Sequence, residues 1–221
     1  MSKCLAIYGA SGGAKETFQV VNDIQKNSPR WSDVVFIDDT VPAGEFKGHK
    51  MMPYVEFKKC YSPETAEFHV ALGEVEHKKM LSLRVMEDGF ALASLIHPDA
   101  IIDEGATLGK GVQVKMGAHI SSGVVLGDGT WVQAFATIRE GTTVGAYSQI
   151  SAKVSIGKDC QIGNTAFVGM HATVYDGVKI GDSAIIAMGA TAVDDVAVEA
   201  VCVGNPGRIM MKNTTHRVFG G

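Results

Sequence analysis

Aliphatic residues occupy every sixth position between residues 102 and 192, without a break in phase. These positions are Ile102, Leu108, Val114, Ile120, Leu126, Val132, Ile138, Val144, Ile150, Ile156, Ile162, Val168, Val174, Ile180, Ile186 and Ala192. A small residue (Ala, Ser, Thr, Cys or Val) stands four positions after each of the sixteen. An α-helix repeats its apolar face about every 3.6 residues and a strand about every 2, so neither explains this period. The pattern predicts a parallel β-helix, in which three short rungs close a coil of about eighteen residues.

The third position after each aliphatic residue is predicted to turn a corner of the coil. Glycine occupies it repeatedly, and Lys153, Asp159 and His171 occupy it elsewhere. Because glycine adopts positive φ without steric cost, we expect that backbone conformation at these corners. Sixteen hexads make slightly more than five coils, and stacked coils bury the aliphatic residues that one coil alone leaves open.

Residues before the hexads have the pattern of a parallel α/β unit. Short apolar runs predict strands at Cys4–Ala10, Val34–Ile37 and Phe68–Leu72, and helical spacing predicts helices at Ala14–Lys26 and Val75–Met86. The order strand, glycine turn, helix, strand and acidic end is typical of a nucleotide-binding unit.

Two domains are therefore expected. The first, residues 1–97, is a Rossmann-like α/β domain with a small parallel sheet and the pattern of a nucleotide-binding unit. The second, residues 98–221, is the β-helix with a short C-terminal tail. The run Ser94–Ala100 is the expected junction, and the repeat decays after Val196.

Composition changes this picture little. The 221 residues, 46% of them hydrophobic, suffice for two modest domains. A net charge of −4 gives no general attraction to nucleic acid or to an anionic membrane, and no stretch is long enough to span a bilayer. Met1–Lys3 leads directly into the first apolar run, so we expect no signal peptide and a cytoplasmic protein. Four scattered cysteines without CxxC spacing predict reduced thiols.

The glycine turn at residues 9–13 lies between the first strand and the first helix. It can hold a phosphate on backbone N–H groups, or it is an ordinary tight turn. It lacks a complete GxGxxG pattern and a P-loop lysine, so nucleoside triphosphate chemistry is not expected. Two aspartates end the second strand, where a carboxylate commonly meets a ribose or base. The predicted substrate-binding residues are Gly9, Ser11, Gly12, Gly13, Asp38 and Asp39.

Two histidines of the β-helix have catalytic capacity. His119 and His171 are expected near one corner of the coil, about three coils apart. Stacked coils are about 4.8 Å apart, so these two cannot chelate one ion within a subunit, and no metal is expected. Each histidine is either a general base or a solvated or packing residue.

The hexads, the N-terminal domain and the GNPGR near the end together resemble the bacterial left-handed β-helix sugar acetyltransferases that carry a Rossmann-like N-terminal domain. That family includes sialic acid O-acetyltransferases and N-acetyltransferases of UDP-4-amino-sugars. The resemblance covers nearly the whole chain. It rests on YGASGG, IDD, LIHPDAII, TVGAYSQIS, KIGDSAIIAMGATAV and VGNPGRIM. It implies a homotrimer, acetyl-CoA bound in a groove between adjacent subunits, and a nucleotide sugar resting on the N-terminal domain.

Two positions depart from that family at the reaction centre. In hexad phase, the family's catalytic histidine falls on Glu140, and a second family histidine near the acetyl group falls on Gln149. Desolvation in an interface groove could raise the pKa of Glu140 and make it a base, an effect that the neighbouring Arg139 opposes. The alternatives are that Glu140 is a solvated corner residue, or that His119 or His171 is the base. Gln149 cannot carry a proton, so we expect it to position the acyl group.

The resemblance also implies contacts to the acyl donor. In phase with the family, these fall near Lys158, Met170 and Met188, with Arg208 and Lys212 near the phosphates of CoA. The alternative for the two basic residues is a solvated tail.

A glutamate in place of the histidine favours an amine acceptor, because a hydroxyl needs a base tuned towards pH 7. We therefore predict an acetyl-CoA-dependent N-acetyltransferase that acts on a UDP- or dTDP-linked amino-deoxysugar in bacterial surface glycan synthesis. One alternative is an O-acetyltransferase of a sugar such as sialic acid. Another is a non-catalytic trimer that binds nucleotide sugar or CoA.

Overall fold

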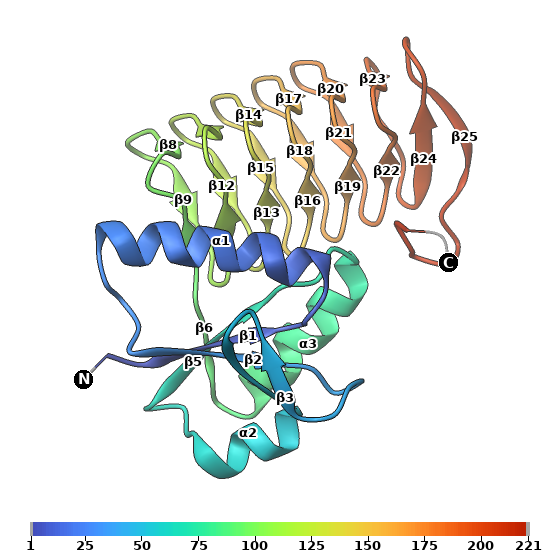
Figure 1. Cartoon of the computed structure of the whole chain (residues 1–221). Coiled ribbons are helices and arrows are strands. Elements are labelled where there is room, and N and C mark those ends of the chain that lie inside the picture. The colour runs from blue at the N-terminus through green and yellow to red at the C-terminus, as the bar shows by residue number, and fades with distance from the viewer. Residues whose placement is uncertain (1, 220–221) are drawn as a thin grey trace.

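The protein consists of a small α/β domain and a β-helix, with helix α1 lying between them (Figure 1). This computed structural model describes residues 2–219, so Met1, Gly220 and Gly221, which the predicted domains include, lie outside it. Within residues 2–219, no helix has the length and apolar character needed to cross a membrane.

The N-terminal sheet has six strands in the order β3-β4-β2-β1-β5-β6. The strands are β1 (Cys4–Tyr8), β2 (Asp33–Ile37), β3 (Gly44–Phe46), β4 (His49–Met52), β5 (Ala66–Val70) and β6 (Ala91–Leu92). The helices are α1 (Gly12–Asn27), α2 (Tyr54–Cys60) and α3 (Val75–Glu87). All strand pairs are parallel except β3–β4. The predicted Rossmann-like domain is confirmed, while β3, β4, α2 and β6 were not predicted, because they are short and lack a clear apolar period.

The β-helix is built from two-residue strands that form three parallel sheets. One sheet contains β7 (Leu95–Ile96), β10 (Gln113–Val114), β13 (Trp131–Val132), β16 (Gln149–Ile150), β19 (Phe167–Val168), β22 (Ile185–Ile186) and β24 (Ala200–Val203), and antiparallel β25 (Arg208–Lys212) at its edge. The second contains β8 (Ile101–Ile102), β11 (His119–Ile120), β14 (Thr137–Ile138), β17 (Ser155–Ile156), β20 (Thr173–Val174) and β23 (Thr191–Ala192). The third contains β9 (Thr107–Leu108), β12 (Val125–Leu126), β15 (Thr143–Val144), β18 (Gln161–Ile162) and β21 (Lys179–Ile180). We refer to them as the first, second and third β-helix sheets.

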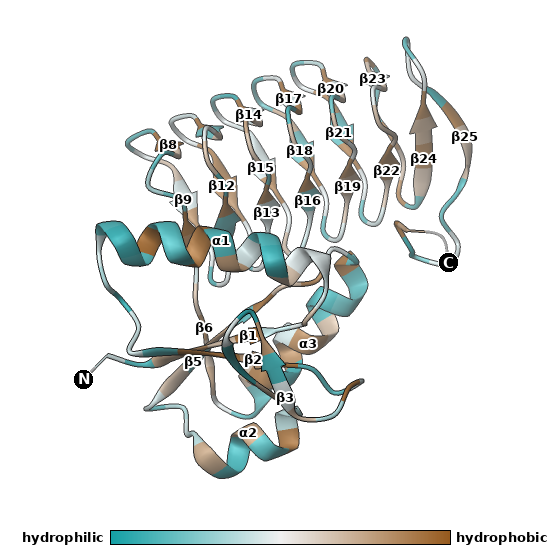
Figure 2. Ribbon diagram, viewed as in Figure 1, coloured by the Kyte–Doolittle hydropathy of each residue, from teal (hydrophilic) through white to brown (hydrophobic). Residues whose placement is uncertain are grey.

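As far as β23, each rung residue stacks on the residue eighteen positions further on, as His119 does on Thr137 and Ile120 on Ile138. In the last coil the spacing shortens to sixteen, as between Ile185 and Val201. The aliphatic residue of each hexad points inward and joins one continuous core. Figure 2 shows this arrangement as hydrophobic rungs separated by more hydrophilic outer turns. The predicted left-handed parallel β-helix is confirmed.

Every corner position from residue 105 to residue 189 has positive φ, as the hexads predicted. Residues other than glycine also adopt it, including Phe135 (φ 60°) and Tyr147 (φ 60°). The Phe135 ring lies directly over a glycine of the preceding coil, since a Cβ on Gly117 would come within 2.5 Å of it. The left-handed corner is therefore imposed by the stack, and glycine is needed where an aromatic ring covers it.

Trp131 of β13 joins the two domains. It is buried in a cluster with Leu5 and Ile7 of β1, and with Val20 and Val21 of α1. The first β-helix sheet therefore uses its outer face to cover the N-terminal domain.

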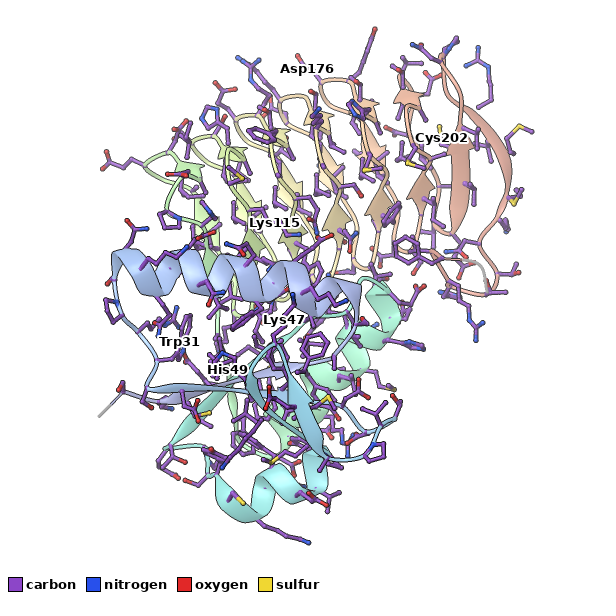
Figure 3. The ribbon with its side chains drawn as sticks, viewed as in Figure 1. Trp31, Lys47, His49, Lys115, Asp176 and Cys202 are labelled. Atoms are coloured by element: carbon purple, nitrogen blue, oxygen red, sulfur yellow. The ribbon has the colours of Figure 1, made fainter. Side chains whose placement is uncertain are left out.

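Polar contacts border this seam. The Gln113 side-chain amide donates to the Thr17 hydroxyl (3.1 Å). Lys115 pairs with Glu16, and Figure 3 shows Lys115 beside α1, whereas Asp176 lies at the outer turns of the coils.

Replacing Gly145 with alanine should destabilise the β-helix by about 2–4 kcal/mol, the range of costs for a core change that the surroundings cannot absorb. A Cβ on Gly145 would lie 2.5 Å from the backbone of Gly163, which cannot move aside. Gly189→Ala is the matched control: it meets nothing within 4 Å and has only the strain of φ +67°, which is worth about 1–2 kcal/mol. Urea unfolding would measure both, and equal losses would contradict the steric argument.

Candidate functional site

A pocket of about 500 Å³ lies at the carboxyl ends of β1 and β2, beside the start of α1. Four of the predicted substrate-binding residues line it, namely Gly9, Ser11, Asp38 and Asp39. Gly9 has φ +116°, and a Cβ there would come within 3.2 Å of the Ala71 carbonyl oxygen, so this corner of the pocket requires glycine. Chain order thus brings the glycine turn and the two aspartates to one edge of the sheet, where parallel α/β folds bind ligands.

The start of α1 faces this pocket. Its N-cap residue, Ser11, makes no side-chain capping bond, and Gly12 and Gly13 form its first turn. The N-terminus of a helix offers backbone N–H groups and a partial positive charge to an anion. Gly13 also has a packing role, because a Cβ there would lie 3.0 Å from the Ala71 carbonyl oxygen. Both interpretations of the turn therefore have structural support.

Asp39 is held by three donors. It accepts hydrogen bonds from the Tyr8 hydroxyl (2.7 Å), the backbone N–H of Tyr54 (2.8 Å) and the Arg84 guanidinium (2.7 Å). Burial acts to raise the pKa of Asp39, but these bonds and the Arg84 charge outweigh it and hold the pKa below its usual range. Asp39 is therefore a fixed carboxylate that orients Arg84 and Tyr8.

Sequence reasoning missed the part of the pocket that α3 supplies. His77, Met80, Leu81 and Arg84 all line it. Their spacing of three and four residues places them on one face of a helix, a signal that was present in the sequence. The sequence analysis predicted a helix at Val75–Met86 but assigned it no residue of the site.

Glu140 lies at a corner of the β-helix just after β14, with about half of its side chain exposed. Its carboxylate lies 3.3 Å from Arg139 and 3.7 Å from Lys158, one coil further on. A hydrogen bond from its own backbone N–H, with the charges of Lys158 and Arg139, lowers the pKa of Glu140 in the single chain. Of the two opposing effects expected from the sequence, the lowering of the pKa prevails in the single chain, with the largest contribution from the backbone N–H and smaller ones from the two cations.

Gln149 lies on a different sheet. It belongs to β16, is only 7% exposed and carries a buried Oε1 without a hydrogen-bond partner in residues 2–219. One chain therefore does not bring Gln149 and Glu140 together.

The two histidines are separated as expected. His119 is on β11 and His171 at the corner before β20, and three coil steps connect these strands. The His119 Nε2 lies 3.1 Å from the Asp103 carboxylate, so this ring is oriented. His171 is exposed, with φ 58°.

The expected acyl-donor residues lie on two corners and at the C-terminal end. Met170 and Met188 are exposed and one coil apart on one corner, whereas Lys158 stands on the corner that carries Glu140. Arg208 and Lys212 are exposed at the two ends of β25. Between the corners, a groove of about 550 Å³ runs over the second β-helix sheet past Arg139, Ser155 and Tyr175.

Comparison with known families matches both parts of the chain. Residues 4–85 match the PglD N-terminal domain, and residues 159–191 match the bacterial transferase hexapeptide (six repeats). The chain joins a PglD-type N-terminal domain to a hexapeptide-repeat β-helix. The resemblance inferred from the sequence is thus confirmed.

Solved structures are similar over nearly the full length of the chain. The acetyltransferase domain of PglB from Neisseria gonorrhoeae FA1090, also solved in complex with acetyl coenzyme A, is 26% identical with a TM-score of 0.88; the match covers 95% of this chain and 100% of that domain. PerB from Caulobacter crescentus, in complex with CoA and GDP-perosamine, is 24% identical with a TM-score of 0.74, over 94% and 97% of the two chains. The latter likeness shows a shared fold.

Arg84→Met should weaken binding of a nucleoside diphosphate to the PglD-type domain about tenfold, because it removes the only arginine or lysine among the described residues that line the pocket, and a hydrogen bond to a charged group is worth about 1.5–3 kcal/mol. Titration calorimetry with UDP, dTDP and GDP would measure it. Lys59→Met removes an exposed cation on α2, outside the pocket lining, and should leave binding unchanged. Unaltered affinity in Arg84→Met would remove this residue from the site.

Proposed function

We propose that this protein is an acetyl-CoA-dependent N-acetyltransferase that acts on an amino group of a UDP- or dTDP-linked amino-deoxysugar. The observation that carries the proposal is the match over 95% of the chain to a PglB acetyltransferase domain solved with acetyl coenzyme A. The pocket of the N-terminal domain agrees with the acceptor. We further propose a role in bacterial surface glycan synthesis and a cytoplasmic location.

The nucleotide is proposed to lie with its base and ribose near Asp38 and Asp39 and its phosphates at the start of α1. The aspartates offer carboxylate acceptors, and the helix start offers N–H donors. The sugar then extends out of the pocket towards a β-helix.

The acyl donor is proposed to lie between neighbouring copies of a homotrimer. Within one chain, Glu140 and Lys158 share one corner, while Met170 and Met188 share another. A groove between two copies can combine one corner of each, and it can also bring Gln149 of one copy towards Glu140 of the next. Arg208 and Lys212 are then available to the phosphates of CoA.

In the proposed reaction, the sugar amine attacks the thioester carbonyl and forms a tetrahedral intermediate. Glu140 accepts the proton that the amine loses, the C–S bond breaks, and CoA leaves as the thiol. Backbone N–H groups stabilise the oxyanion, and Gln149 helps to hold the acyl group. The lowered pKa of Glu140 makes it a carboxylate at neutral pH. A carboxylate of low pKa is basic enough to accept the proton that the amine loses after its attack. It is too weak a base to deprotonate a hydroxyl efficiently, so N-acetylation is favoured over O-acetylation.

Glu140→Gln should lower kcat about 100-fold, the usual contribution of a general base, while leaving the affinity for the nucleotide unchanged. Release of CoA thiol would be measured with acetyl-CoA and a panel of nucleotide amino sugars and their hydroxy analogues. Glu104→Gln is the matched control, since Glu104 occupies the equivalent corner two coils earlier. Full kcat in Glu140→Gln would assign the base to another residue, with His119 and His171 tested next. Ligand binding without turnover would favour a scaffold over either transferase.

A further inference from the structure

Lys78 is a buried amine that the proposed reaction does not use. It lies on α3, is 1% exposed, and its Nζ lies 4.9 Å from the centre of the Trp131 ring and 3.5 Å from the Ser148 carbonyl oxygen. Among residues 2–219, no carboxylate lies within 4.0 Å of it. A buried lysine without an anionic partner is rare, because removing its charge from water is unfavourable.

The surroundings of Lys78 are polar but uncharged. Four buried polar atoms have no hydrogen-bond partner within residues 2–219. They lie on β5 and on the first β-helix sheet, the elements on the two sides of the contact between the domains: His69 Nε2, Gln113 Oε1, Trp131 Nε1 and Gln149 Oε1. His69 stacks on Trp131, with ring centres 6.0 Å apart, and burial lowers its pKa to about 4, so this ring is neutral.

Other titratable groups on the surrounding elements leave Lys78 without a counter-ion. Glu16 of α1 is paired with Lys115 next to β10, and Tyr147 precedes β16 as a neutral phenol. Glu76 and Lys79 of α3 are partly exposed and lie within 3.9 Å of each other. The carboxylate of Glu74, the N-cap residue of α3, accepts hydrogen bonds from the backbone N–H groups of Val218 and Phe219.

Trp131 connects Lys78 to the nucleotide pocket. A Cβ on Gly13 would lie 3.9 Å from the tip of the Trp131 ring, so this ring underlies the first turn of α1. His77, the residue before Lys78, lines the same pocket. The amine therefore lies behind the start of α1, across a layer of aromatic rings that contains no mobile ions to screen its charge.

The pocket itself holds too little positive charge for a diphosphate. Of its lining side chains, Arg84 is positive and Asp38 and Asp39 are negative, and Arg84 is shared with Asp39 at 2.7 Å. Arg84 alone therefore does not balance a bound diphosphate, and further positive charge must come from the α1 terminus and from groups behind it.

We propose that Lys78 is a buried counter-charge for the diphosphate of the nucleotide, so that binding at the start of α1 transfers a proton from solvent to its amine. The inference rests on the proposed function for the nature of the ligand. The charge on Lys78 would make the pocket prefer ligands that carry a diphosphate, because the neutral ribose and base gain no binding energy from that charge.

The titration of Lys78 supports the geometry. Burial lowers its pKa to about 7, so the amine is largely neutral above that pH in the free protein. A nearby anion favours the charged form and raises the pKa on binding. Proton uptake is therefore expected between the free and the bound pKa values, and it vanishes well below pH 7, where the amine is already charged.

Titration calorimetry of UDP in buffers of different ionisation enthalpy, from pH 6 to 9, tests this. The wild-type chain should take up a fraction of a proton near pH 7.5 to 8, with affinity that falls as pH rises. Lys78→Met should bind about tenfold more weakly at pH 7, the effect of losing one unit charge that acts through protein at an effective dielectric of about 20, and should take up no proton through this group. Lys78→Arg keeps the charge at every pH, so it should bind well and also take up none.

Two controls separate the possible outcomes. His77→Gln should keep the uptake, because the inference assigns the proton to Lys78 and not to the histidine that lines the pocket. Lys79→Met removes a neighbouring exposed charge and should change neither quantity. The inference would be overturned if proton uptake on UDP binding were lost in His77→Gln and kept in Lys78→Arg. It would also be overturned if Lys78→Met bound UDP as tightly as the wild-type chain.

Failure of the inference is distinct from failure of the proposed function. A wild-type chain that binds none of UDP, dTDP and GDP would overturn the nucleotide-sugar assignment itself. Binding without any linked proton would overturn only the role of Lys78. Thermal unfolding shows whether each variant folds, and the Lys78→Arg comparison decides the question even where Lys78→Met is unstable.

Discussion

The stacking of backbone positions eighteen residues apart is the constraint on which the rest of the structure depends. Each rung has only two residues, so no coil is stable by itself, and its inward side chain, left-handed corner and strand partners must all repeat in register. That is why Gly145, whose neighbour in the stack is backbone, has no room for a Cβ. It also fixes Glu140 and Lys158 as neighbours, one coil apart, on an exposed corner.

The seam between the two domains depends on that regularity. A flat sheet face presents Gln113, Trp131 and Gln149 in one column, and the N-terminal domain packs on the Trp131 part of it. The same contact places Lys78 against Trp131 and sets Trp131 behind the first turn of α1. The position of the N-terminal pocket relative to the β-helix therefore depends on the apolar cluster around Trp131 and on its polar surroundings.

The fold was predictable because its signals are periodic. The hexads predicted the rungs and corners from residue 102 onward, and the glycine turn with Asp38 and Asp39 predicted one side of the pocket. The sequence did not predict the other side of the pocket, which includes Arg84 and His77. These residues reach the pocket because α3 packs on β5 and β6, and that packing is a tertiary contact. The strands β3 and β4 are too short to show a hydrophobic period in the sequence.

The sequence by itself determined the β-helix, its corners and the order of the N-terminal elements, because each follows from spacing along one chain. Only the tertiary structure decided which polar residues are exposed and which are buried. Glu140 and Gln149 occupy equally well-defined hexad positions, yet Glu140 is half exposed between two cations and Gln149 is only 7% exposed. Lys78 is one charged residue among several on α3 in the sequence. Its burial follows from the contact between the two domains, which no local pattern records.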